Sequence, residues 1–110
     1  MKYIKTFENF INEASASQGP KVKRLMQTLK DVEYETIKDM EGQDEEPSDA
    51  LYSAMKQVGC SAEECIVIGE YHTTDTVDWN SVLDAAKKAG IEYVEATDDN
   101  GSAIVFSSKQ

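Results

Sequence analysis

The residues best suited to chemistry lie in segment 69–75, which follows a short apolar run. Glu70, His72 and Asp75 in this segment could serve as a general base, a proton shuttle and a metal ligand. In open α/β folds, ligands collect where a strand ends and a helix begins. The segment therefore supports one hypothesis, a small enzyme that depends on a metal ion or on phosphate. The competing interpretation is that Asp75 and Thr76 cap the next helix and that His72 is a surface residue.

The two cysteines, Cys60 and Cys65, lie five positions apart and have no third or fourth cysteine to complete a zinc site. We expect Cys65 to be a small buried apolar residue and not half of a disulfide, because nothing in the sequence indicates an oxidising compartment. No complete catalytic set is recognisable. A binding protein without cofactor or metal is therefore favoured over an enzyme.

The chain is strongly acidic, with 11 Lys and Arg against 21 Asp and Glu and a formal charge of −10 over 110 residues. This balance disfavours direct binding to nucleic acid or to an anionic membrane, both of which need clustered basic side chains. The charge is also uneven, because residues 1–30 carry six basic and two acidic groups while the remainder is acidic. The sequence thus predicts a dipolar domain, with a basic protein as the better partner.

The densest acidic stretch runs through residues 31–49, where nine carboxylates accompany one Lys. Such a run is typical of a solvated helix face followed by a charged loop. The functional alternative is an acidic face that binds a basic partner or imitates a DNA backbone and so inhibits a nucleic-acid-binding protein. That face would comprise Asp31, Glu33, Glu35, Asp39, Asp44, Glu45 and Glu46.

The elements that must position these residues follow from periodicity and from capping residues. Helices are predicted over residues 1–13, 21–33 and 49–58, and over the segment that ends at Gly90. Residues 32–40 could prolong the second helix or form a strand. The apolar run 65–68 is typical of a strand covered on both faces, and Thr74–Thr76 could cap the last helix. Strands 91–97 and 102–107 flank Asn100-Gly101, a strong hairpin signal.

The fold class predicted is a small single α/β (α+β) domain over residues 21–110, ending in a β-hairpin. Its order is α-α-β-α-β-β, or β-α-β-α-β-β if residues 32–40 are a strand. The amphipathic helix 1–13 precedes it and is joined by the linker 14–20, which is small, polar and ended by Gly-Pro. The N-terminal helix is therefore expected to sit apart from the domain.

Residues 1–13 begin with Met-Lys, carry the pair Phe10-Ile11 and end in an Ile-x-Glu motif formed by Ile11 and Glu13, ahead of Ala14. The segment is similar to the capsid-targeting propeptides of internal head proteins of T-even-type tailed phages. Those propeptides begin with Met-Lys, carry a Phe-Ile or Phe-Leu pair and end in Leu-x-Glu or Ile-x-Glu, where the prohead protease cuts. The resemblance implies packaging into the prohead and cleavage between Glu13 and Ala14.

The implied partners are the prohead scaffold or protease, or a host protein. The implied location is the virion interior and then the host cytoplasm; without packaging, the cytoplasm is expected. A second Ile-x-Glu match, from Ile68 to Glu70, falls in the predicted buried strand, where a protease cannot reach.

Overall fold

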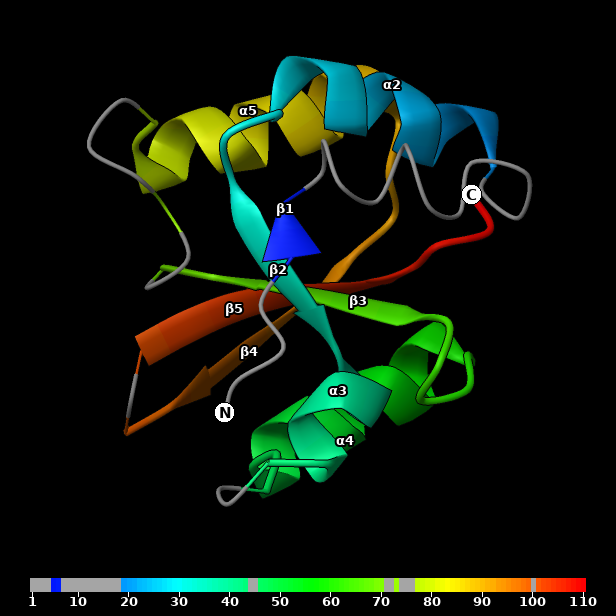
Figure 1. Ribbon diagram of the computed structural model, residues 1–110, viewed down its shortest axis with the longest axis vertical. Helices are drawn as coiled ribbons and strands as arrows, with labels where there is room; N and C mark the ends of the chain where they lie inside the picture. Colours follow the sequence, from blue (N-terminus) through cyan, green and yellow to red (C-terminus); the bar gives the residue numbers. More distant parts are fainter. Residues whose placement is uncertain (1–4, 7–18, 44–45, 71–72, 74–76, 100) are drawn as a thin grey trace.

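A computed structural model describes residues 5–6, 19–43, 46–70, 73, 77–99 and 101–110 (Figure 1). Its centre is a five-stranded sheet in the order β1-β2-β3-β5-β4, and every neighbouring pair is antiparallel. The strands are β1 (Lys5–Thr6), β2 (Glu33–Thr36), β3 (Cys65–Gly69), β4 (Val94–Asp98) and β5 (Gly101–Ser107). The predicted class, a small α/β (α+β) domain that ends in a hairpin, is confirmed.

Helices cover both faces of the sheet, as Figure 1 shows. On one face lie α2 (Pro20–Thr28) and α5 (Trp79–Ala89), and on the other lie α3 (Ile37–Glu41) and α4 (Asp49–Val58). No helix in the described part of the chain has the length and apolar composition needed to cross a lipid bilayer.

Strand β3 is buried along its whole length, which explains its unbroken apolar sequence. Ile66 and Ile68 face the core under α2 and α5, together with Leu25, Val82 and Phe106. Cys65 and Val67 face the second core, which is closed by Ile37, Leu51 and Ala54 of α3 and α4 and by Val105 of β5. The prediction of a strand covered on both faces is confirmed, and each face has its own core.

Residues 32–40 contain both of the structures that the sequence left open. Strand β2 occupies Glu33–Thr36, and α3 begins immediately after it. Thr36 ends the extended segment and caps the helix, because its hydroxyl accepts from Asp39 N while the Asp39 carboxylate accepts from Thr36 N. The second helix accordingly ends earlier than predicted, at Thr28.

The cap of α4 is confirmed, and that of α5 is corrected. Ser48 accepts from Leu51 N at the start of α4, which ends at Gly59 with a φ of 81°. Helix α5 does end at Gly90, but it begins at Trp79 with Asp78 as its N-cap. Thr74–Thr76, which were expected to cap it, lie outside the described residues.

The C-terminal hairpin is present, with its loop one residue earlier than the Asn-Gly signal suggests. Asp98 pairs with Gly101, so that residues 99 and 100 connect the strands. The register then continues through Ala96 and Ala103 to Val94 and Val105. Strand β5 lies between β3 and β4 and is antiparallel to both, so β3 and β4 run in the same direction. Helix α5 connects these two non-adjacent strands.

The predicted N-terminal helix is wrong at the two residues of that segment which the structure describes. Lys5–Thr6 form β1, with Lys5 opposite Tyr34 and Thr6 opposite Glu33 (Figure 1). A lone helix of this length is marginal in water, whereas pairing with the edge of β2 gives backbone groups partners. The expectation that this whole segment sits apart from the domain is therefore also wrong for β1.

Candidate functional site

Glu70, the first residue of the predicted catalytic segment, follows β3 directly and is exposed. Its carbonyl accepts from the Thr73 hydroxyl at 2.9 Å. A Cβ placed on Gly101 would lie 3.9 Å from the Glu70 carboxylate, so this side chain faces the β4–β5 hairpin. His72 and Asp75, the proposed shuttle and ligand, lie outside the described residues.

The surroundings of Glu70 differ from the crevice that the sequence suggested. Both strands beside β3, β2 and β5, are antiparallel to it, so the carboxyl end of β3 meets the amino end of β5 and its hairpin. The strand-end rule applies to parallel sheets, where several strand ends and helix starts converge. Within the described ranges, no three His, Cys, Asp or Glu side chains lie close enough together to hold a metal ion.

Asp78 is a capping residue and not a catalytic one. Its carboxylate accepts from Ser81 N at 2.7 Å, at the start of α5. Hydrogen bonds from Ser81 hold the pKa of Asp78 below its ordinary value, because they stabilise the charged carboxylate. The sequence interpretation expected a carboxylate, that of Asp75, to help cap this helix. A carboxylate does cap it, but the residue is Asp78.

A hollow of about 360 Å³ lies between the end of α4 and the start of β4. It is lined by Gln57, Val58, Glu92, Tyr93, Val94, Ser107 and Gln110. None of the sequence-predicted site residues that the structure describes lines it. Ser107 Oγ accepts from Lys109 N, and no histidine is among the described lining residues. The described lining therefore shows no Ser–His pair.

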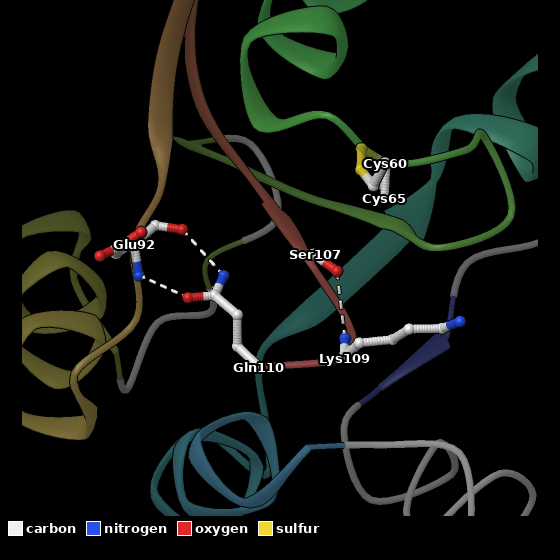
Figure 2. Close-up of a disulfide and its surroundings, with 6 residues drawn as sticks. All are labelled: Cys60, Cys65, Glu92, Ser107, Lys109 and Gln110. Carbon is white, nitrogen blue, oxygen red and sulfur yellow. Dashed lines mark hydrogen bonds between the residues drawn. A yellow bond between two sulfur atoms is a disulfide. The ribbon is translucent and has the colours of Figure 1, made fainter.

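The side chain of Gln110 closes one end of this hollow. It accepts from Glu92 N at 2.8 Å and donates to Glu92 O at 2.9 Å, as Figure 2 shows. The amide of Gln110 thus pairs with the chain just before β4 much as a neighbouring strand would. Its role is structural, since both of its polar atoms are used.

Of the seven acidic residues proposed as one binding face, the five that the structure describes do not share one exposed face. Asp31 is exposed at the α2 end of β2, whereas Glu46 is exposed just ahead of α4, at the opposite end of β2. Glu35 is only 4% exposed and accepts from Gln43 Nε2 at 2.6 Å. Glu33 is half-buried in β2, and Asp39 is half-buried and serves the α3 cap. Asp44 and Glu45 lie outside the described residues.

Other carboxylates gather on the α3–α4 side of the sheet. The exposed carboxylates of this side form what we call the acidic layer, which consists of Glu41, Glu46, Asp49 and Glu63. Tyr52 of α4 donates its hydroxyl to Glu41 of α3 at 2.8 Å and so ties the two helices together. The hydrogen bond to Glu41, with burial and the nearby charges of Glu41 and Glu46, raises the pKa of Tyr52.

The opposite, α2–α5 side carries most of the basic groups. Exposed there are Lys21, Lys23, Arg24, Lys87 and Lys88. Lys21 of α2 lies beside Gly90 at the end of α5, 3.6 Å from where a Cβ would stand. Lys88 pairs with Asp84 at 2.9 Å within α5. The charge asymmetry of the sequence therefore becomes a difference between the two helical layers.

The processing residues Ile11, Glu13 and Ala14 lie outside the described residues, whereas the structure describes the contacts of the segment that begins at Gly19. Gly19 N donates to Ser108 O, and Lys21 N donates to Gln110 O at 2.9 Å. A Cβ on Gly19 would overlap the backbone of Gln110, so only glycine fits there. Gly19 and the start of α2 are thus held against the C-terminal residues, at the end of the predicted linker.

The cysteine prediction is half right. Cys65 is fully buried, as expected, but it forms a disulfide with Cys60, with 5.9 Å between the two Cα atoms (Figure 2). The tight turn after α4 brings the pair together, because Cys65 N donates to Ser61 O. The spacing of five residues is compatible with a disulfide. We expected none because nothing in the sequence indicates an oxidising compartment.

Comparison of the chain with protein-family models, with curated protein sequences and with solved structures found no match. We therefore infer the function from the residues of the chain itself.

Proposed function

We propose that the chain is a phage protein packaged into the virion, with an N-terminal segment that directs it into the prohead and is removed after Glu13. Its acidic domain then binds a basic surface of a host or viral protein. The observation that carries this proposal is the position of the cut relative to the core. The proposed cut falls five residues before Gly19, and among the described residues the buried core runs from Val22 to Phe106, beyond the cut.

A protease needs an extended, accessible segment, and the two Ile-x-Glu matches differ in this respect. Ile68 is fully buried and hydrogen-bonded into the sheet between β2 and β5. The match ending at Glu13 precedes a run of small and polar residues instead. This contrast supports cleavage at Glu13.

The binding half of the proposal is supported by the acidic layer. Its carboxylates belong to α3, to α4 and to the segments just ahead of α4 and β3, on the side of the sheet away from α2 and α5 with their basic groups. Residues 1–13 carry two Lys and two Glu, so their removal leaves the charge of −10 on the domain. Complementary charge speeds the encounter with a basic partner and orients it.

Mass spectrometry of assembled particles tests the packaging step. We expect a species that begins at Ala14, and we expect Glu13→Gln to leave an uncut chain in the particle. Glu70→Gln is the matched control, because it alters the other Ile-x-Glu site and is expected to change nothing. Particles that contain only chains beginning at Met1, or none at all, would overturn the proposal.

Titration with a short oligolysine peptide, followed by NMR, tests the binding surface. Amide shifts are expected to concentrate in α3, α4 and residues 61–64, and Glu46→Gln with Glu63→Gln is expected to weaken binding. Asp84→Asn with Asp78→Asn removes the same charge on the α2–α5 side and serves as the control. Equal weakening by both pairs would show that net charge, and not the acidic layer, governs binding.

A further inference from the structure

The edge of the sheet at β2 is occupied by an unusually short strand. Strand β1 contributes only Lys5 and Thr6, opposite Tyr34 and Glu33. The other half of β2 pairs on its opposite side with β3, through Glu35 with Val67 and Thr36 with Ile66. Strand β2 would therefore be the last strand of the sheet if β1 left.

The departure of β1 would leave the rest of the domain in place. Twelve residues, 7–18, separate β1 from Gly19, and every core residue in the described part of the chain lies at or after Val22. Val32 and Tyr34 are anchored in the core beneath α2 and α5, so β2 is held by its own side chains. The ladder between β1 and β2 is thus the contact most easily exchanged.

An edge strand without a partner presents unpaired backbone N–H and C=O groups, which bind another extended segment. The carboxylates near this edge are Asp31, which is exposed, and Glu33, which is half-exposed, while Glu35 is turned inward onto Gln43. Lys30 is exposed beside Asp31, so the carboxylates outnumber the basic group two to one. An incoming strand with basic residues would meet this excess of negative charge.

We propose that the outer edge of β2 is a strand-docking site, held by β1 in the full chain and taken by an extended basic segment of a protein partner after β1 is removed. This inference rests on the proposed processing after Glu13. The propeptide then has two roles, because the segment that directs the chain also covers the edge until it is cut. The edge of β2 and the acidic layer are separate surfaces. A partner that binds both would have to match two surfaces, which increases the specificity of binding.

Hydrogen exchange on the full chain tests the docking site. The double variant Lys5→Pro/Thr6→Pro removes the backbone donors of β1, and we expect the amides that face β1, at Glu33 or Tyr34, to exchange about tenfold faster or more. Amides of β3 and β5 are expected to stay protected. The control Ser15→Pro/Ser17→Pro places the same two prolines outside β1 and is expected to change nothing.

The docking step is then tested in trans. A synthetic peptide of residues 1–13, added to the Lys5→Pro/Thr6→Pro variant, is expected to restore protection at β2. The same peptide with Lys2→Glu and Lys5→Glu is expected to bind about tenfold more weakly, a difference of about 1.4 kcal/mol.

Unchanged exchange in the proline variant, or no protection from the added peptide, would overturn the docking site. Equal binding of the acidic peptide would overturn its preference for basic segments. Both measurements are independent of the particle, so the absence of a species beginning at Ala14 would overturn the processing alone.

Discussion

Gly19 lies where the backbone of the last residues crosses the start of α2. A Cβ at this position would overlap the main chain of Lys109 and Gln110, which side-chain rotation cannot relieve. We therefore expect Gly19→Ala to lower the free energy of unfolding by about 1 to 3 kcal/mol, as overpacking does.

Gly42→Ala is the matched control for that substitution. The nearest atom to a Cβ on Gly42 is Asp39 O at 3.6 Å, and its φ of −85° suits any residue. Its effect on stability is expected to stay within about 0.5 kcal/mol. Urea denaturation of the two variants measures the difference, and equal stabilities would show that the C-terminal tail does not pack on Gly19.

Asp78 gives the chain a pH-dependent cap. Its pKa is lower in the folded protein than the ordinary 3.8, because Ser81 hydrogen-bonds the charged carboxylate. Its contribution is therefore present above about pH 4, near the ordinary value, and is lost as the pH falls through the lower folded pKa.

The variant Asp78→Asn is expected to keep the cap at neutral pH, since Asn is also a good N-cap, and to flatten the acid limb of stability. Thermal melts between pH 7 and pH 2 check this. Parallel acid limbs for the two proteins would contradict it.

At the scale of elements, the disulfide joins the end of α4 to the start of β3. Closing so short a loop is expected to stabilise the domain by about 2 kcal/mol. The variant Cys60→Ser should lose that amount and become insensitive to reductant, whereas the wild type should fall to the same stability when reduced. Urea midpoints measured with and without dithiothreitol check this, and a wild type indifferent to reductant would contradict it.

The elements that the sequence predicted well are those in which local signals agree with tertiary packing. Helix α4 carries a capping Ser48, an apolar face and Gly59, and β3 is a continuous apolar run. Strand β2 was ambiguous because the periodicity of residues 32–40 suits both a helix and a strand, and its buried Glu35 accepts a hydrogen bond from Gln43. That partnership depends on α3 turning back, which no local pattern encodes.

The candidate site shows the same limit. The acidic run is visible in the sequence, but the prediction assumed that residues close in sequence lie on one face of the fold. In the fold β2 carries the run from one helical layer to the other, so Asp31 and Glu46 separate. The contact of Tyr52 with Glu41 crosses a loop between two helices, and only the packed α3–α4 layer brings them together.

At the scale of the whole molecule, the domain is expected to be independent of the segment that the proposed processing removes. Residues 14–110 should unfold in one cooperative transition, with a free energy of unfolding within about 1 kcal/mol of the full chain. The reason is that, among the residues that the structure describes, both cores lie between Val22 and Phe106 and β1 contributes a two-residue ladder. Urea denaturation followed by circular dichroism measures this.

The informative control for that truncation is the loss of a much shorter piece at the other end. Residues 108–110 supply the hydrogen bonds to Gly19, Lys21, Glu64 and Glu92. Deleting these three residues is expected to cost about 3 to 5 kcal/mol, because five hydrogen bonds are lost at roughly 0.5 to 1 kcal/mol each. If deleting residues 1–13 destabilised the domain more than deleting residues 108–110, the N-terminal segment would belong to the core, and its removal in the virion would unfold what it is proposed to deliver.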